Sequence, residues 1–188
     1  MTHERILCAG FGGQGVMSLG QLLAYAGMLE DRHVTWLPSY GPEMRGGTAY
    51  CSVIVSDTPI GSPIVVGSAT CAMVMNLPSL LKFEPSLRPG GLLLVNGSLI
   101  NQPPKRSDLR VITLAANDLA TQCGQPRAAN MVMLGAYLAL FPVVSMDSVA
   151  TAFTKVFGAK AEKFLPQSLQ AMERGAEAAL NAEATLAA

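Results

Sequence analysis

Short apolar runs alternate with segments of helical periodicity along most of this chain. After the first apolar run, Val16, Leu19, Leu23 and Ala26 recur at intervals that place them on one face of an α-helix. Apolar and β-branched runs predict strands at residues 5–9, 33–37, 48–56, 70–76, 92–95 and 109–114. Helical patterns predict helices at residues 16–29, 78–83, 128–140, 147–157 and 160 to about 180.

Glycine and proline separate these segments. Residues 57–63 contain two prolines and a glycine, and Pro89-Gly90-Gly91 predicts a turn before the strand at 92–95. Strands that alternate with helices are typical of an α/β fold whose sheet is mainly parallel. We therefore expect one Rossmann-like domain over residues 1–188, with a mostly parallel sheet flanked by helices and a helical C-terminal part.

The composition is unusually apolar. Hydrophobic residues make up 50% of the chain and charged residues 14%, with a formal net charge of zero, whereas a soluble domain usually has about 25% charged residues. We expect a large core or a surface that partner chains bury, and self-association of the isolated chain. A neutral chain does not favour nucleic acid as a partner.

No apolar stretch is long enough to predict a membrane span. The apolar run that follows Met1 reaches Gly10 too early for a signal peptide. These features indicate a cytoplasmic protein. The four cysteines Cys8, Cys51, Cys71 and Cys123 are far apart and form no C-x-x-C pair. Their spacing predicts small core residues in a reducing compartment, and no iron–sulfur or zinc site.

The first strand leads into a glycine-rich loop, in which Gly10, Gly12 and Gly15 fit G-x-G-x-x-G. Such a loop can hold backbone N–H groups against an anion at a helix N-terminus. The dinucleotide-binding version also needs a carboxylate at the end of the second strand. Here Glu30 and Asp31 precede that strand, which disfavours NAD. Glycines that only allow close packing of helix on sheet are the alternative.

A second loop follows the second strand, and its charged residues stand between glycines. Arg45 has a planar fork of donors that suits a phosphate or a carboxylate. An ion pair with Glu43, or with a partner chain, is an equally good interpretation. The sequence offers no catalytic set, since the serines lack a nucleophile elbow and His33 has no nearby acidic or cysteine partner.

Three segments together carry a family resemblance. They are Gly10-Phe11-Gly12-Gly13-Gln14-Gly15, Tyr40-Gly41-Pro42-Glu43-Met44-Arg45-Gly46-Gly47 and Asn130-Met131-Val132-Met133-Leu134-Gly135-Ala136. In sequence and spacing the two loop segments resemble the gamma subunits of pyruvate and other 2-oxoacid:ferredoxin oxidoreductases, and the third resembles a motif in a C-terminal helix of that family. The resemblance extends over nearly the whole chain.

The resemblance implies a role in a multi-subunit enzyme that converts a 2-oxoacid, coenzyme A and oxidised ferredoxin into acyl-CoA, CO2 and reduced ferredoxin. It implies alpha, beta and delta subunits as partners, with ferredoxin contacted only indirectly. Thiamine diphosphate and iron–sulfur clusters would lie in those partners, so that this chain binds no cofactor alone. The compact form resembles most the branch that uses 2-oxoglutarate.

Within such a complex, the chain is expected to support assembly and to contribute to the coenzyme A site. The candidate contacts are the residues of the two loops: Gly10, Gly12, Gly13, Gln14, Gly15, Tyr40, Gly41, Arg45, Gly46 and Gly47. Two other functions stay open from the sequence. One is an independent Rossmann-type nucleotide-binding enzyme, and the other is a pure assembly module.

Overall fold

The computed structural model describes residues 2–39, 48–65 and 67–186. Six strands form one sheet in the order β2-β3-β1-β4-β5-β6. The strands are β1 (His3–Phe11), β2 (His33–Ser39), β3 (Thr48–Ser56), β4 (Ala69–Val74), β5 (Leu87–Asn96) and β6 (Arg110–Leu114). β1, β4, β5 and β6 are parallel, whereas β3 is antiparallel to both β1 and β2. The predicted α/β fold with a mostly parallel sheet is therefore confirmed.

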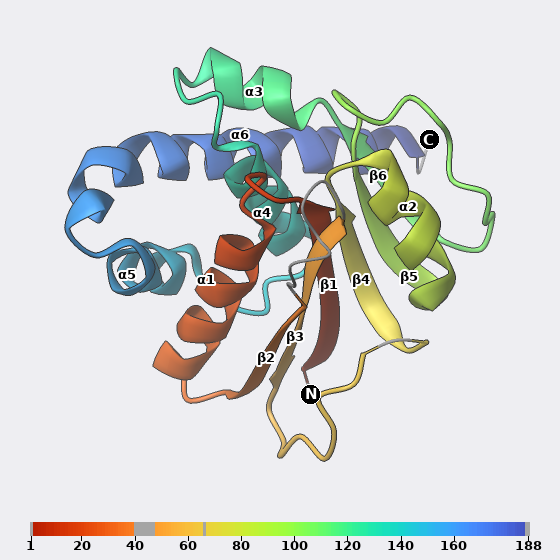
Figure 1. Cartoon of the computed structure of the whole chain (residues 1–188), viewed down its shortest axis with the longest axis horizontal. Coiled ribbons are helices and arrows are strands. Elements are labelled where there is room, and N and C mark those ends of the chain that lie inside the picture. The colour runs from red at the N-terminus through yellow and green to blue at the C-terminus, as the bar shows by residue number, and fades with distance from the viewer. Residues whose placement is uncertain (1, 40–47, 66, 187–188) are drawn as a thin grey trace.

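Helices cover both faces of this sheet (Figure 1). They are α1 (Val16–Leu29), α2 (Leu77–Phe83), α3 (Ala116–Gln122), α4 (Ala129–Leu140), α5 (Met146–Phe157) and α6 (Ala161–Leu186), with short 3-10 turns η2 (Glu84–Ser86) and η3 (Gly158–Lys160). The larger core lies between the sheet and α1, α3, α4, α5 and α6. A smaller core lies on the opposite face, under α2. Among the described residues, no helix has the length and apolarity needed to cross a membrane.

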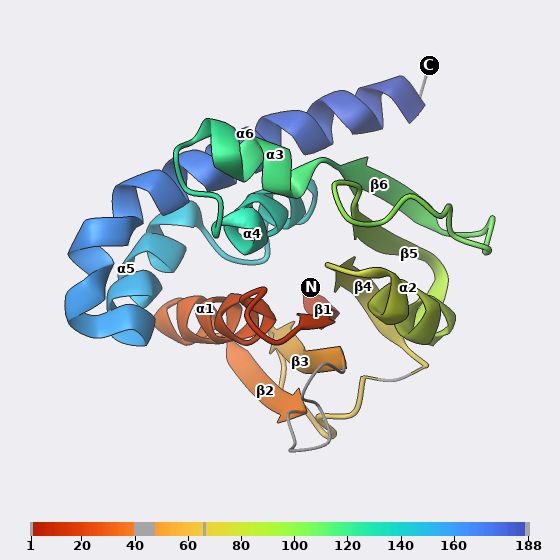
Figure 2. The same cartoon turned by 45° about the horizontal axis from the view of Figure 1, so that its top comes forward.

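The largest helix–helix contact joins α4 to α6. A side-chain carbon at Gly135 would overlap the Met172 carbonyl oxygen, and one at Gly175 would overlap the Val132 carbonyl oxygen. Each helix thus presents a glycine to the backbone of the other at the crossing point. This close approach holds α6 along the helical layer, behind α3 and α4 in the view of Figure 2.

Three predicted boundaries need correction. Pro89-Gly90-Gly91 lies within β5, because a bulge against β4 absorbs the extra residues between the pairs Ala69–Leu87 and Cys71–Leu92. Residues 116–122 form α3, for which no helix bounds were predicted. The last helix runs to Leu186, beyond the predicted end near residue 180, since the terminal segment is rich in strong helix formers such as alanine and glutamate.

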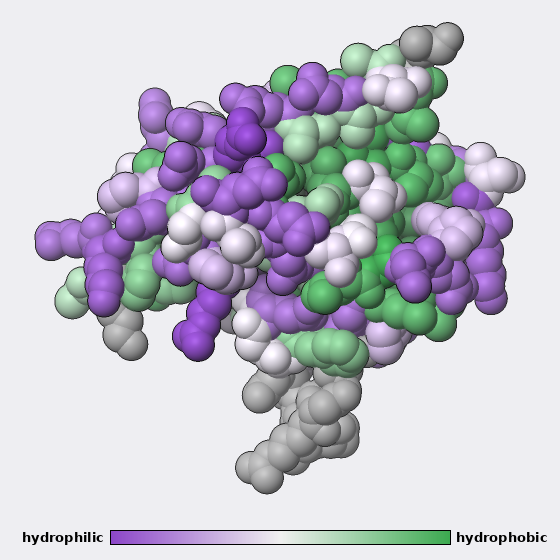
Figure 3. All heavy atoms as spheres, turned by 90° about the horizontal axis from the view of Figure 1, so that it is seen from above, coloured by the Kyte–Doolittle hydropathy of each residue, from purple (hydrophilic) through white to green (hydrophobic). Residues whose placement is uncertain are grey.

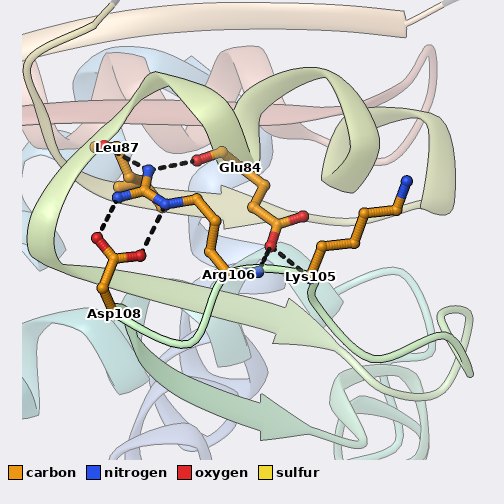
Figure 4. A network of polar contacts seen from close by, with 5 residues as sticks. All are labelled: Glu84, Leu87, Lys105, Arg106 and Asp108. Atoms are coloured by element: carbon orange, nitrogen blue, oxygen red, sulfur yellow. Dashed lines mark hydrogen bonds and ion pairs between the residues drawn. The ribbon is translucent and has the colours of Figure 1, made fainter.

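The polar loop between β5 and β6 is fastened to the α2 side by a buried carboxylate (Figure 4). Glu84, only 3% exposed, accepts hydrogen bonds from the backbone N–H groups of Lys105 and Arg106, each at 2.6 Å. The Arg106 guanidinium donates to the Leu87 carbonyl oxygen at 2.6 Å and to both carboxylate oxygens of Asp108. This network has a structural role, since each of its partners belongs to the loop, to η2 or to β5.

Candidate functional site

The first glycine loop lies between β1 and α1, at the edge of the sheet where the parallel strands end, which we call the carboxyl edge. The loop closes as a turn in which the Gln14 N–H donates to the Phe11 carbonyl oxygen at 3.1 Å. Gly13 and Gly15 have left-handed backbones, with φ values of 93° and 73°. A residue with a side chain would be strained at either position. The predicted loop is thus formed, and its residues Gly10 to Gly15 lie together at this edge.

The carboxyl edge contains the point where the chain changes from one face of the sheet to the other. α1 follows β1 onto one face, and α2 follows β4 onto the opposite face. In open α/β sheets, ligands bind in the crevice outside such a point. The glycine loop therefore occupies the position where this architecture usually places a ligand.

The Gln14 side chain links the glycine loop to the residues that follow β4. Its side-chain oxygen accepts a hydrogen bond from the Phe11 N–H at 2.6 Å, and its side-chain nitrogen donates to the Met75 carbonyl oxygen at 3.3 Å. Asn76 donates to the same Gln14 oxygen at 3.3 Å. The amide predicted as a ligand contact thus bonds to the chain itself, so the described geometry assigns Gln14 to shaping the loop.

The glycines of the loop differ in their surroundings. A side-chain carbon at Gly10 would lie 2.9 Å from Met75 Cβ, and one at Gly15 would lie 2.8 Å from Asn130 Cγ. By contrast, a side-chain carbon at Gly12 or Gly13 would meet no described atom within 4 Å. Close packing therefore accounts for Gly10 and Gly15. It does not account for Gly12, whose backbone is also not left-handed.

The N-terminus of α1 opens beside these glycines. Gly15 is the cap residue and forms no side-chain cap hydrogen bond, and the first turn contains no acidic residue. The first-turn N–H groups have no acceptor within a helix, and the helix dipole adds partial positive charge there. A depression of about 350 Å³ faces them, lined by Phe11, Gly12, Gly13, Gly15, Val16, Met17, Ser18 and Ala49. This arrangement suits an anion.

A second, mainly apolar groove of about 450 Å³ lies on the other side of the same helix end. Gly15 and Ser18 line both cavities. The remaining lining comes from the approach to α4 and from the neighbouring ends of α5 and α6: Gln125, Arg127, Ala128, Asn130, Met131, Phe153, Phe157, Phe164 and Ser168. The start of α1 therefore lies between a depression beside the glycine loop and a groove with three phenylalanines.

The predicted second loop, with Tyr40, Gly41, Arg45, Gly46 and Gly47, lies outside the described residues. The residues that flank it are placed by strand pairing. Thr48 pairs with Phe11, and Ser39 pairs with Tyr50 in the adjacent register. Both ends of the second loop are therefore at the carboxyl edge, as is the first glycine loop.

Neither candidate for a ribose-binding carboxylate lies at this edge. Glu30 caps α1 at its far end and accepts a hydrogen bond from the Ser145 N–H at 2.7 Å, and Asp31 follows in the turn to β2. Partial burial raises the pKa of Glu30, but hydrogen bonds from Ser145 and Ser148 outweigh it and hold the pKa below its usual value. Both carboxylates are thus separated from the glycine loop by the 14 residues of α1, which disfavours dinucleotide binding.

No three of the cysteines are grouped as metal ligands among the described residues. Cys8, Cys51, Cys71 and Cys123 are all buried, and burial raises the pKa of the Cys8 and Cys71 thiols well above the ordinary value. Metal ligation requires the thiolate form. Within residues 2–39, 48–65 and 67–186, no group of three or more histidine, cysteine, aspartate or glutamate side chains is arranged to hold a metal ion.

The sequence did not reveal that Asn130 contacts the glycine loop. This residue, at the start of α4, donates from Nδ2 to the Gly15 carbonyl oxygen at 3.1 Å. In the sequence it opens the third segment of the family resemblance and is a polar residue at the start of an otherwise apolar helix, Ala129–Leu140. A local pattern of this kind cannot identify a partner 115 residues away.

Similar proteins cover most of this chain. It is 39% identical over 174 residues to the ketoisovalerate oxidoreductase subunit VorA of Methanothermobacter marburgensis. The aligned residues cover 92% of this chain and 36% of VorA. It is 31% identical over 153 residues to the 2-oxoglutarate synthase subunit KorC of Methanocaldococcus jannaschii, covering 80% of this chain and 81% of KorC. The chain thus spans about a third of VorA but most of KorC.

The fold matches a solved subunit of the same kind. The keto/oxoacid ferredoxin oxidoreductase gamma subunit from Geobacter sulfurreducens superposes with a TM-score of 0.81 at 29% identity, over 95% of this chain and 99% of that one. Residues 5–178 match the family described as pyruvate ferredoxin/flavodoxin oxidoreductase. That match includes the first glycine loop, the second loop and α4. This chain therefore belongs to the pyruvate ferredoxin/flavodoxin oxidoreductase family.

Proposed function

We propose that this chain is the gamma-type subunit of a multi-subunit 2-oxoacid:ferredoxin oxidoreductase. The complex would convert a 2-oxoacid, coenzyme A and oxidised ferredoxin into acyl-CoA, CO2 and reduced ferredoxin. Family membership over residues 5–178 supports this function, as does the match to 99% of a subunit named gamma. The match to only 36% of VorA indicates that this relative also contains parts that the present chain does not correspond to.

Alpha, beta and delta subunits are the proposed partners, and they would supply thiamine diphosphate and the iron–sulfur clusters. Thiamine diphosphate would provide the carbanion chemistry at the 2-oxoacid, and the clusters would carry electrons to ferredoxin. The buried thiols of this chain do not fit a cluster. We therefore assign electron transfer to the partner subunits.

The role that we assign to this chain is to help hold coenzyme A at the start of α1. Gly12 carries the proposal, because neither its backbone nor any described neighbour within 4 Å requires a glycine there. Close approach of a ligand is the reason that we propose for a glycine at this position. Phosphate oxygens of coenzyme A would accept hydrogen bonds from the first-turn N–H groups of α1, and Arg45 of the second loop is the proposed additional donor.

Pure assembly is the second candidate function. The sequence of α1 contains no charged residue, and Tyr25, Met28 and Leu29 on that helix are 42%, 60% and 47% exposed. An uncharged, partly apolar helix surface is typical of a protein–protein contact. These residues lie toward the end of α1 that is remote from the glycine loop, so an assembly contact there would be separate from the proposed coenzyme A site.

The substrate is proposed only as a 2-oxoacid. 2-Oxoglutarate was expected from the sequence and stays a prediction, because the relative of 39% identity is named for ketoisovalerate and the relative of 31% identity for 2-oxoglutarate. No described residue of this chain is assigned to recognition of the 2-oxoacid. Its selection is proposed to belong to the thiamine-bearing subunits.

Affinity purification of the tagged chain from its native source tests the proposal. We expect thiamine- and cluster-bearing subunits to co-purify, and the eluate to reduce ferredoxin when coenzyme A and one member of a panel of 2-oxoacids are supplied. The panel should contain pyruvate, 2-oxoglutarate and ketoisovalerate. Recovery of the chain without such subunits would contradict the function. Recovery of a complex whose activity does not depend on the loop residues would leave assembly as the role.

A further inference from the structure

The carbonyl oxygen of Gly15 accepts hydrogen bonds from two donors. The Leu19 N–H donates to it at 3.0 Å, which forms the first hydrogen bond of α1. Asn130 Nδ2 donates to the same oxygen at 3.1 Å from the start of α4. One carbonyl thus joins the first turn of α1 to a helix that begins more than one hundred residues later in the chain.

Asn130 also packs against the α-carbon of Gly15. Its side chain is 7% exposed, and its Cγ would lie 2.8 Å from a side-chain carbon at position 15. Gly15 has a left-handed backbone with φ 73°. The Asn130 amide therefore occupies the space that a side chain at position 15 would need.

Two side chains hold the segment around Gly15. Gly15 itself, the cap residue of α1, has no side chain and forms no side-chain cap hydrogen bond. Gln14 fastens the preceding part of the loop to Phe11 and to Met75 at the end of β4. Gln14 thus holds the loop to the sheet, and Asn130 holds its helical end to α4.

We propose that Asn130 is a positioning residue, which keeps the Gly15 peptide in its left-handed form and the first turn of α1 intact. Its amide orients the N–H groups of that turn toward the depression beside Gly12. The contribution to ligand binding rests on the proposed function, because the ligand in question is coenzyme A. The contribution to the helix end does not rest on that function and can be measured separately.

Two substitutions separate the hydrogen bond from the shape of the side chain. Asn130→Ala removes the whole amide. Asn130→Asp keeps the shape but places a carboxylate oxygen against the Gly15 carbonyl, where no donor remains. The matched control is Asn96→Ala, because Asn96 is also a buried asparagine and its Nδ2 donates to Asn117 at 2.8 Å, away from the glycine loop.

Amide hydrogen exchange of the full chain reports on the helix end. We expect the Leu19 amide to exchange about three- to tenfold faster in both Asn130 variants, which is the effect of one lost hydrogen bond. Asn96→Ala should leave Leu19 at the wild-type rate. In the purified complex, the Asn130 variants should raise the KM for coenzyme A by a similar factor with kcat unchanged.

The outcomes distinguish the inference from the proposed function. Faster exchange at Leu19 together with a raised KM supports both. Faster exchange with an unchanged KM supports the positioning role of Asn130 and contradicts the coenzyme A role of the loop. Wild-type exchange at Leu19 in both Asn130 variants overturns the inference. Equal acceleration by Asn96→Ala also overturns it, because the effect would then be a general loss of stability.

Discussion

At the residue scale, the glycines of the first loop divide into two kinds that substitution can separate. Gly15→Ala should lower the free energy of unfolding by about 2 kcal/mol or more, because the left-handed backbone and Asn130 both oppose a side chain. Gly12→Ala should change it by less than about 0.5 kcal/mol, yet weaken coenzyme A use or subunit docking in the complex. Urea unfolding of each variant and the KM for coenzyme A measure the two effects.

The Gly12 substitution is the sharper test of the two. If Gly12→Ala unfolds as easily as Gly15→Ala, the glycine is required by the chain itself and the argument for a ligand is wrong. If it is stable, assembles normally and retains the wild-type KM for coenzyme A, neither a ligand nor a partner approaches the loop at that point.

The sequence predicts the members of this loop but not their separate roles. The G-x-G-x-x-G spacing between a strand and a helix is a local pattern, so Gly10 to Gly15 could be assigned to one turn. The residues that distinguish Gly10 and Gly15 from Gly12 include two from elsewhere in the chain, Met75 beside Gly10 and Asn130 beside Gly15. Contacts of this kind depend on the tertiary fold, and no spacing in the sequence encodes them.

At the element scale, the α4–α6 crossing depends on two glycines. Gly135→Ala or Gly175→Ala should lower the free energy of unfolding by about 3 kcal/mol, since each added methyl overlaps a backbone carbonyl of the other helix. Gly61→Ala is the control, because a side-chain carbon there meets no described atom and the backbone is not left-handed. Equal urea midpoints for the Gly135 variant and the control would show that the helices do not cross at this distance.

The contact between α1 and α5 should contribute less to the free energy of unfolding at acidic pH. Glu30 at the end of α1 accepts the Ser145 N–H at the start of α5, and its pKa is lowered in the folded chain. A lowered pKa contributes stability above the unfolded value of about 4.3, and this contribution is lost as pH falls through the folded value. The effect is small because the carboxylate is only partly buried.

Glu30→Gln removes this titration. Between about pH 6 and about pH 3, the free energy of unfolding should fall less in Glu30→Gln than in the wild type. Chemical unfolding at several pH values measures the difference. A steeper fall in the variant would show that the carboxylate is not stabilised in the folded chain.

Elements with a strong periodic pattern could be predicted, and those that depend on tertiary contacts could not. The helix at residues 16–29 was predicted at its observed bounds because its apolar face is regular. The first part of β5 was not, since Pro89-Gly90-Gly91 is typical of a turn. It extends the strand only because the bulge against β4 accommodates it and the Gly90 N–H donates to the Asp108 carbonyl oxygen at 2.8 Å.

At the scale of the whole molecule, the exposed apolar surface predicts association of the isolated chain. Seen from above the carboxyl edge, apolar surface gathers beside the C-terminal end of α6 (Figure 3). In that part of α6, Leu180 and Leu186 are 50% and 67% exposed. The uncharged surface of α1 adds Tyr25 and Met28. Light scattering of the purified chain should show a mass that rises with concentration, whereas a constant monomer mass would contradict the prediction.

The central claim is that this chain completes a 2-oxoacid:ferredoxin oxidoreductase and has no turnover alone. The most direct measurement is the rate of coenzyme A-dependent ferredoxin reduction by the partner subunits, assayed with and without this chain at saturating 2-oxoacid and thiamine diphosphate. The account predicts activity only when the chain is present, and none for the chain by itself. Full activity of the partners without the chain, or turnover by the chain alone, would contradict it.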